Sequence, residues 1–358
     1  MKKKSLLFLL FITIILVIVT IYTILAKSTS PIVVSDRNLA FPNLLEEIND
    51  VGKIVINYKE NQYSIIYENQ NWFLKEKNNY LVPREKVRNF LLELTNLILV
   101  ERKTKLRNRL KRLDLDKPSD ISESRQINVF NKNGKLIASG FIGKRKYFLY
   151  VDGRSGTYIR LNNELQTWLA EGEMNFGFYP RDWLDKKVFD FNPKDVSNIT
   201  IFHADGSTTE SLRKNSESKM SLLNIDPNRE FKTDNEGDRL AYVVENFEFF
   251  DVYPRQEINF LTKPHTKSSA IYKFFDGFAI KFDIFSLTEE KKKSEFEEPT
   301  RWARIIINPD NLILDSKYSL EKINILNKFL KQWDFKLQDL DGIRTTKKIE
   351  SMLKPQSN

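Results

Sequence analysis

The pattern of apolar and polar positions begins with an unbroken apolar run from Leu6 to Ala26, preceded by three lysines at positions 2–4 and followed by Lys27. At about 1.5 Å per residue, a helix of this length spans about 30 Å, the thickness of a bilayer's hydrocarbon core. The lysines before the run favour a cytoplasmic N-terminus. The pattern therefore predicts a single-pass anchor in the lipid bilayer from Leu6 to Ala26, with the bulk of the chain extracytoplasmic. The alternative is a cleaved signal peptide, whose apolar core is usually about 7–15 residues.

After the anchor, short apolar segments alternate with polar turns and predict a first module. Stretches rich in β-branched and aromatic residues predict strands over residues 53–56, 63–67 and 71–74. After Pro83, apolar residues at the spacing of one helical face predict a helix that carries Val87, Phe90, Leu91, Leu94 and Ile98. Two hairpins are predicted next, over residues 126–142 around the Asn133-Gly134 turn and over residues 147–161, and then a short helix over residues 164–170.

The same order of elements returns about 145 residues later. Residues 198–202 predict the opening strand, and the second helix is predicted to carry Leu240, Val243, Val244, Phe247 and Phe250, at an offset of about 153 residues. A hairpin over residues 270–285, a strand over residues 302–307 and a closing helix over residues 320–333 follow. Because the order, the turn chemistry and the offset agree, we predict that the module is duplicated.

The predicted fold class is α+β, with an N-terminal transmembrane helix followed by two tandem similar modules of antiparallel sheet with packed helices. The predicted parts are a cytoplasmic tip and anchor (1–27), a juxtamembrane segment (28–50), a first module (51–171), a linker (172–194), a second module (195–345) and a tail (346–358). Residues 215–237 and 288–298 break the repeat, and we interpret them as exposed loops.

Composition limits the chemistry of the extracytoplasmic region. The chain has no cysteine, which excludes thiol catalysis, lipidation at cysteine and cysteine metal sites. With 26 Phe and 13 Tyr against 12 Gly, the whole chain has the residues for a folded sheet core. The net charge is +9, of which +5 remains once the four lysines that flank the apolar run are set aside. This mild excess fits an anionic surface or an acidic partner, and we expect no nucleic-acid partner.

Motifs that carry catalysis are scarce. The two histidines, His203 and His265, have no partner at metal-ligand spacing, and we interpret them as ordinary surface or turn residues. The sequence contains no glycine-rich phosphate loop and no nucleophile elbow, and we treat the Ser-x-x-Lys string at residues 216–219 as a coincidence. We therefore expect no catalytic residue, cofactor or metal. Carboxylates are numerous, however, and a paired Asp/Glu site stays open as an alternative.

The best candidate for a contact surface is a basic stretch with seven cations and no acid. Its cations are Arg102, Lys103, Lys105, Arg107, Arg109, Lys111 and Arg112. Leu106, Leu110 and Leu113 recur at helical spacing and are predicted to dock a short helix onto the module. The cations could bind anionic lipid headgroups or an acidic partner, although the usual role of such a run is a solvated charged face.

Five sequence segments resemble a known bacterial family. They are KIVI at 53–56, NWFL at 71–74, VPREKV at 82–87, RLDLDKP at 112–118 and WLDKKVFDF at 183–191. Together with the N-terminal anchor they look like the family "domain of unknown function 4340", although Asp114 stands where the family usually has a glycine. The resemblance implies a single-pass envelope protein, encoded beside gliding-motility-type ABC transporter components. The family has no established catalytic residues, so it implies none here.

These observations predict an extracytoplasmic accessory or scaffolding protein of a bacterial envelope complex, anchored in the cytoplasmic membrane. The resemblance extends the prediction to ABC-type transporter subunits as partners. Two alternatives stay open. One is a periplasmic carboxylate-dependent enzyme that acts on cell-wall or lipid material, for which two acidic residues in a shared cleft would be the sign. The other is a ligand-sensing module with a deep aromatic pocket between the modules.

Overall fold

The computed structural model describes residues 38–149, 153–226, 228–255, 265–287, 299–309 and 318–355, together with residues 13, 15–17, 313 and 316. The predicted anchor from Leu6 to Ala26 lies outside these residues except at positions 13 and 15–17, which are helical. Among the described residues, no helix is long and apolar enough to cross a membrane. The transmembrane helix therefore stays a prediction.

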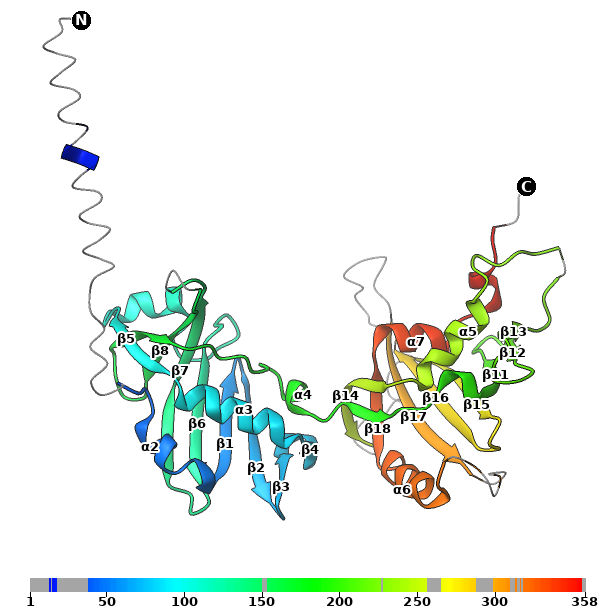
Figure 1. The fold of residues 1–358 in the computed structure, drawn as a ribbon, viewed down its shortest axis with the longest axis horizontal. Helices are drawn as coiled ribbons and strands as arrows, with labels where there is room; N and C mark the ends of the chain where they lie inside the picture. The colour runs from blue at the N-terminus through cyan, green and yellow to red at the C-terminus, as the bar shows by residue number, and fades with distance from the viewer. Residues whose placement is uncertain are drawn as a thin grey trace, which may run out of the picture.

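The first sheet contains nine described strands, and every pair of neighbours is antiparallel. They are β1 (Val51–Tyr58), β2 (Asn61–Glu68), β3 (Asn71–Leu74), β4 (Tyr80–Val82), β5 (Ile98–Arg102), β6 (Arg125–Asn131), β7 (Leu136–Lys146), β8 (Gly156–Leu161) and β9 (Thr167–Glu171). Their order across the sheet is β4-β3-β2-β1-β6-β7-β8-β9-β5. The helices are α2 (Pro42–Glu46), α3 (Arg84–Thr95) and the 3-10 helices η1 (Ile48–Asp50), η2 (Lys75–Lys77) and η3 (Arg107–Leu113). Figure 1 shows α3 lying across one face of this sheet.

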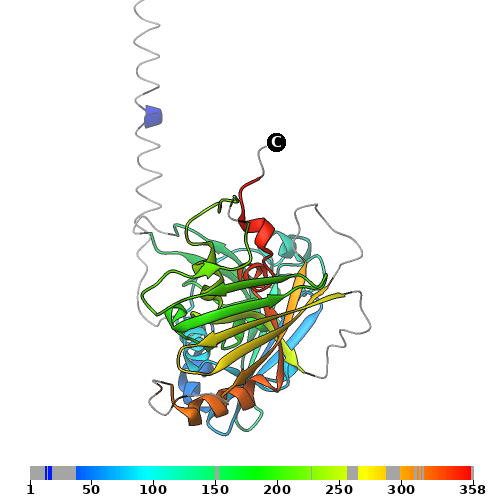
Figure 2. The ribbon, with the colours of Figure 1, turned by 90° about the vertical axis from the view of Figure 1, so that its right-hand side faces the viewer.

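The second sheet has the described strands β10 (Lys187–Phe189), β11 (Val196–Phe202), β12 (Thr208–Leu212), β13 (Ser221–Leu222), β14 (Phe247–Pro254), β15 (His265–Phe274), β16 (Ala279–Leu287), β17 (Thr300–Asn308) and β18 (Trp333–Leu337). Their order is β10-β14-β18-β17-β16-β15-β11-β12-β13. The helices are α4 (Pro180–Trp183) in the linker, α5 (Glu236–Ala241), α6 (Leu320–Leu330), α7 (Asp339–Thr345), η4 (Pro193–Asp195), η5 (Tyr242–Val244) and η7 (Ile349–Met352). Figure 2 views this module end on, with α6 below the strands.

The two sheets have the same strand order. Read from β3, the first sheet runs β3-β2-β1-β6-β7-β8-β9-β5, and read from β13, the second runs β13-β12-β11-β15-β16-β17-β18-β14. Four strands (β1 to β4) precede α3 in the first module and three (β11 to β13) precede α5 in the second, and in each module the strand that follows the helix lies beside the last strand. The predicted α+β fold of two antiparallel sheets is confirmed, and this shared order is that of two tandem similar modules.

Local details repeat as well. β1 pairs with β6 through a bulge between Val51 and Lys53, and β11 pairs with β15 through a bulge between Val196 and Asn198. Beside each bulge an aspartate carbonyl accepts a backbone N–H from the hairpin turn, at 2.8 Å for Asp50 and 2.9 Å for Asp195. Bulges re-aim a strand at one defined position, so a shared bulge is evidence for a shared backbone design.

Both predicted module helices end earlier than their apolar spacing suggested. α3 ends at Thr95, and Ile98 already belongs to β5. In the second module α5 ends at Ala241, and Phe247 and Phe250 lie in β14. The prediction was wrong here because a strand that starts directly after a helix continues the apolar pattern for a few residues, and periodicity cannot separate the two.

Two other predicted elements were wrong, and a third, the closing helix, is present but ends early. Residues 164–170 are not a helix, because β9 (Thr167–Glu171) pairs with β8 on one side and with β5 on the other. The partner of β8 is the long strand β7, which ends at Lys146, and the described residues 147–149 form no strand. The closing helix stops at Leu330, and Trp333 begins β18. Of the two predicted loops, residues 215–237 contain β13 and the start of α5, and residues 288–298 lie outside the described residues.

The modules contact each other through unlike edges, with η2 and β4 of the first module against β14 and β18 of the second. Lys77 is 6% exposed, and its Nζ lies 2.8 Å from Oδ1 of Asp251 and 3.4 Å from the ring centroid of Tyr253. The Tyr80 ring packs at 4.9 Å from the Trp333 ring. The buried apolar residues of both modules consequently form one continuous cluster, and Figure 1 shows α4 bridging the two sheets.

Candidate functional site

The predicted contact surface, here called the basic segment (residues 102–112), starts at the end of β5 and continues into η3. Leu110 is buried and Leu113 is partly buried, but Leu106 is 52% exposed, so the prediction that all three leucines dock was wrong. The reason is that only residues from Arg107 onward are helical, and in a 3-10 helix side chains three positions apart share a face. That face carries Leu110 and Leu113.

The cations of the basic segment divide into two groups. The Arg102 guanidinium lies 5.1 Å from the Trp168 ring, and Lys103 pairs with Glu101 at 2.5 Å. The other five are exposed, and none forms an ion pair with a described residue. They are Lys105, Arg107, Arg109, Lys111 and Arg112. Five clustered, uncompensated cations raise the local positive potential and attract an anionic surface.

The start of the first module lies beside the strand that leads into the basic segment. Leu39 forms a bridge with Ile98, and the Leu99 N–H donates to the carbonyl of Asn38 at 2.8 Å. This pairing is antiparallel, so residue numbers fall along the Asn38 segment in the direction in which they rise along β5. Followed back from Leu39 to Asn38, the chain therefore runs toward the Arg102 end of β5. The segment that precedes Asn38 therefore joins the module on the side of the basic segment.

A second candidate is a broad acidic groove of about 740 Å³ in the second module. It is lined by Asp190, Tyr242, Glu245, Asn246, Glu248, Gln338, Leu340, Asp341 and Arg344. Burial raises the pKa of Asp341, and the Arg344 guanidinium at 3.2 Å opposes that rise in part. Hydrogen bonds from Lys187 Nζ and from the Asn246 N–H, both 2.8 Å long, hold the pKa of Asp190 below its usual value. The groove thus contains two carboxyl groups whose pKa values are shifted in opposite directions.

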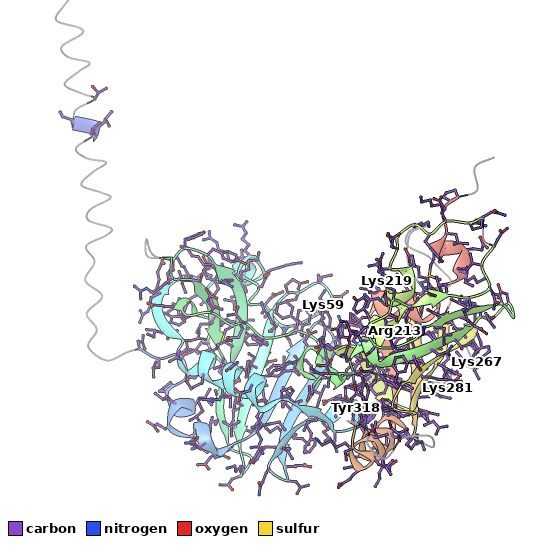
Figure 3. All side chains as sticks on the ribbon, turned by 45° about the vertical axis from the view of Figure 1, so that its right-hand side comes forward. Lys59, Arg213, Lys219, Lys267, Lys281 and Tyr318 are labelled. Atoms are coloured by element: carbon purple, nitrogen blue, oxygen red, sulfur yellow. The ribbon has the colours of Figure 1, made fainter. Side chains whose placement is uncertain are left out.

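Next to this groove is a pocket of about 380 Å³ around Arg213, and it shares Tyr242 and Glu245 with the groove. Arg213 is buried and donates to the Pro193 carbonyl at 3.0 Å and to Asp238 Oδ1 at 2.5 Å. Ser216 and Lys219, the ends of the Ser-x-x-Lys string, belong to its wall. Figure 3 shows Arg213 and Lys219 in the second module. The Arg213–Asp238 pair ties β12 to α5, which is sufficient reason for the buried guanidinium.

The two histidines were predicted as surface or turn residues, and His203 does open the turn between β11 and β12, where the Gly206 N–H donates to its carbonyl at 3.0 Å. His203 is buried directly after β11, and its Nε2 lies 2.9 Å from the Thr209 hydroxyl. Burial lowers its pKa, and the nearby Lys348 lowers it further. His265 is the first residue of β15 and is half-buried, with its ring 5.9 Å from the Phe285 ring. Across the described residues, no three His, Asp or Glu side chains are grouped so as to hold a metal ion.

The sequence alone did not identify the acidic groove. Its lining comes from β10, η5, β14 and α7, which are separated by up to about 150 residues along the chain. Neither Asp341 nor Glu245 lies in a recognisable motif, and Asp190 was noted only as a linker residue. No local signal distinguishes these carboxylates from the many others in the chain, because only the packing of α7 against η5 brings them together.

The fold and these surfaces define a two-module α+β protein with a basic surface in one module and an acidic groove in the other. Residues 72–257, from β3 to the end of β14, match the family described as a domain of unknown function (4340), and the chain belongs to that family. The suspected resemblance is thereby confirmed. No curated protein and no solved structure matches the chain.

Proposed function

We propose that this protein is a single-pass, membrane-anchored accessory or scaffolding subunit of a bacterial envelope complex, with both modules on the extracytoplasmic side. The apolar run from Leu6 to Ala26 and the lysines before it support the anchor and its orientation. The resemblance of the sequence motifs to the family extends the proposal to ABC-type transporter subunits as partners.

The observation that carries the scaffolding role is the interface between the modules. A buried lysine–carboxylate pair and a set of aromatic contacts join the two sheets into one core, so their outer surfaces keep a fixed relative orientation. A buried ion pair is stable only in a narrow range of geometries, so it can select a single arrangement of the two elements that it joins. A rigid pair of modules suits a protein that holds other subunits at set positions.

Two experiments test this proposal. Protease added to spheroplasts should digest the region after Lys27 and spare a short N-terminal fragment, whereas protection of the whole chain would contradict the topology. Affinity purification of the intact protein from solubilised membranes should recover defined partner subunits. Recovery of a soluble, shortened chain from the periplasm would show that the apolar run is a signal peptide and contradict the anchor.

A second candidate function is supported by the acidic groove. Glycoside hydrolysis and related reactions use two carboxyl groups, one protonated as general acid and one ionised, and the groove contains two carboxyl groups, of which Asp341 has a raised pKa and Asp190 a lowered pKa. If the protein acts on cell-wall material, Asp341→Asn and Asp190→Asn should each abolish release of soluble fragments from purified cell wall. The variant Asp205→Asn, which changes an exposed carboxylate outside the groove, is the matched control.

A further inference from the structure

The most exposed large apolar side chain among the described residues lies at the tip of the β7–β8 hairpin. Phe148 is 79% exposed and its neighbour Tyr147 is 64% exposed. Phe148 also has a φ of +54°, in the left-handed region that a residue with a bulky side chain rarely adopts. Neither the exposed ring nor the unfavourable backbone contributes to packing, and adjacent exposed aromatics on a monomer mark an interaction surface.

The tip is held in place by its neighbours. The Arg145 guanidinium stacks at 4.7 Å from the Tyr147 ring and forms an ion pair with Glu173. The Leu149 N–H donates to the Arg154 carbonyl at 2.6 Å, and the Leu149 side chain is turned toward the sheet. These contacts fix the residues on both sides of Phe148 and leave its ring pointing away from the fold.

Cations from two separate elements surround this aromatic pair. Lys144 is exposed, and residues 144–146 immediately precede the tip with the sequence Lys-Arg-Lys. The C-terminal end of η3 packs directly on β7, because a Cβ on Gly143 would lie 2.1 Å from the Leu113 carbonyl, and Lys144 lies 3.8 Å from Asp114. Phe148 follows Gly143 by only five residues, so it lies within about 18 Å of that contact. Figure 1 shows η3 and the β7–β8 tip at the same end of the first module.

We propose that this surface, consisting of Tyr147, Phe148 and the cations of the basic segment and of β7, docks on anionic phospholipid in the outer leaflet. Phe148 and Tyr147 insert at the level of the headgroups, where aromatic side chains are favoured, and the cations lie against the lipid phosphates. The inference rests on the proposed anchor, which keeps the surface close to the bilayer. It also uses the chain direction at Asn38, because the segment before Asn38 joins the module on the side of the basic segment.

An acidic protein partner would explain the cations, but it would also have to offer a pocket for the Phe148 ring, because a protein hot spot seats an aromatic ring in a complementary pocket. A bilayer surface needs no such pocket. A protruding pair of rings combined with the five uncompensated cations of the basic segment has the composition of an interfacial membrane contact, in which a shallow apolar wedge and electrostatic attraction add to each other. Docking would fix the tilt of both modules relative to the membrane.

The test uses the absence of cysteine in the chain. Full-length Phe148→Cys and Ile325→Cys variants, each labelled with an environment-sensitive fluorophore, are reconstituted in vesicles of phosphatidylcholine and phosphatidylglycerol with a lipid-borne quencher. Ile325 is a matched control, since it is 64% exposed but lies on α6 of the second module. Quenching should be at least about threefold stronger at position 148 than at position 325. It should fall to the control level in pure phosphatidylcholine, and when Arg107, Arg109, Lys111 and Arg112 are all changed to Gln.

Equal quenching at both positions, in protein that resists alkaline carbonate extraction, would overturn the docking surface and leave the anchor intact. Strong quenching at position 148 that is unchanged in neutral vesicles would overturn the role of the cations. Release of the protein by carbonate would instead contradict the anchor of the proposed function. An unchanged thermal unfolding midpoint of the quadruple variant shows that it is folded.

Discussion

The two modules share a strand order and differ in the segments that connect their strands. The first module connects β7 to β8 through the Lys-Arg-Lys-Tyr-Phe sequence at residues 144–148, whereas the second connects β16 to β17 through residues 288–298, whose sequence has five glutamates and three lysines. The first of these sequences is cationic and aromatic, and the second has a net negative charge. The comparison shows that the two modules keep the same strand order while their connecting segments differ in charge.

The equivalent edges of the two sheets also have different uses. In the second module, β14 packs against the first module, and Asp251 forms an ion pair with Lys77 there. The equivalent strand of the first module, β5, is bridged by Leu39 and continues into the basic segment. The same strand position therefore holds the modules together in one case and leads to a charged surface in the other. Unlike contacts of this kind make a head-to-tail pair and not a symmetric one.

The largest expected effects come from the cores of the two modules. Phe90 and Phe247 are both buried, as predicted from the sequence, and each Phe→Ala change should lower the free energy of unfolding by about 3–5 kcal/mol. Because the cores are continuous, urea denaturation of the full-length protein followed by circular dichroism should show one transition in both variants. Leu92→Ala, at an exposed position of α3, is the control. Two separate transitions would show that the modules unfold independently.

The next effect concerns the interface that distinguishes β14 from β5. Lys77→Ala leaves Asp251 with an uncompensated charge at a largely buried site, and it should cost about 3 kcal/mol of unfolding free energy. The double variant Lys77→Met with Asp251→Leu should recover most of this loss. Lys187→Ala breaks an exposed pair with Asp190 and should change stability by less than about 1 kcal/mol. A Lys77→Ala protein as stable as the wild type would remove the ion pair from the argument for a rigid scaffold.

A smaller effect measures how alike the two frames are. Gly134 and Gly277 occupy the equivalent hairpin turns with φ of +80° and +92°. An L-residue in this region costs about 1–2 kcal/mol, so Gly134→Ala and Gly277→Ala should each lower the unfolding free energy by about that amount. Thermal denaturation of both variants measures it. If the losses of unfolding free energy in the two variants differ by more than about 2 kcal/mol, the two turns do not have equivalent surroundings.

The smallest effect separates the modules by pH. Tyr58 and His203 occupy equivalent positions, 145 residues apart. Tyr58 is the last residue of β1, and His203 directly follows β11. Burial lowers the pKa of His203 below its ordinary value of 6.5. As the pH falls through 6.5, the unfolded chain binds the proton before the folded chain does, so stability should decrease between about pH 7 and pH 5.5. His203→Gln should reduce that slope in denaturation midpoints, and an unchanged slope would contradict the burial argument.

Much of the frame was readable from local pattern. Val87, Phe90, Leu91 and Leu94 are one buried face of α3, and the Asn133-Gly134 turn closes the β6–β7 hairpin as expected. Family membership also followed from short motifs spread along the chain. These features depend on residues within a few positions of one another, which is the range over which periodicity and turn chemistry act. Only part of the candidate site could be predicted. The cations of the basic segment are contiguous in the sequence, but the residues that surround them in the fold come from other elements.

What the sequence by itself determined is the α+β frame, the repeat of about 145 residues and the stretch of cations from Arg102 to Arg112. Only the tertiary structure decided that Phe247 and Phe250 belong to a strand, since β14 pairs with β10, about 60 residues earlier, and with β18, about 80 residues later. It also decided that Lys77 pairs with Asp251 and that the C-terminal end of η3 packs on β7 at Gly143. Contacts between segments this far apart carry no local signature, because they arise when the strands pair and the modules pack.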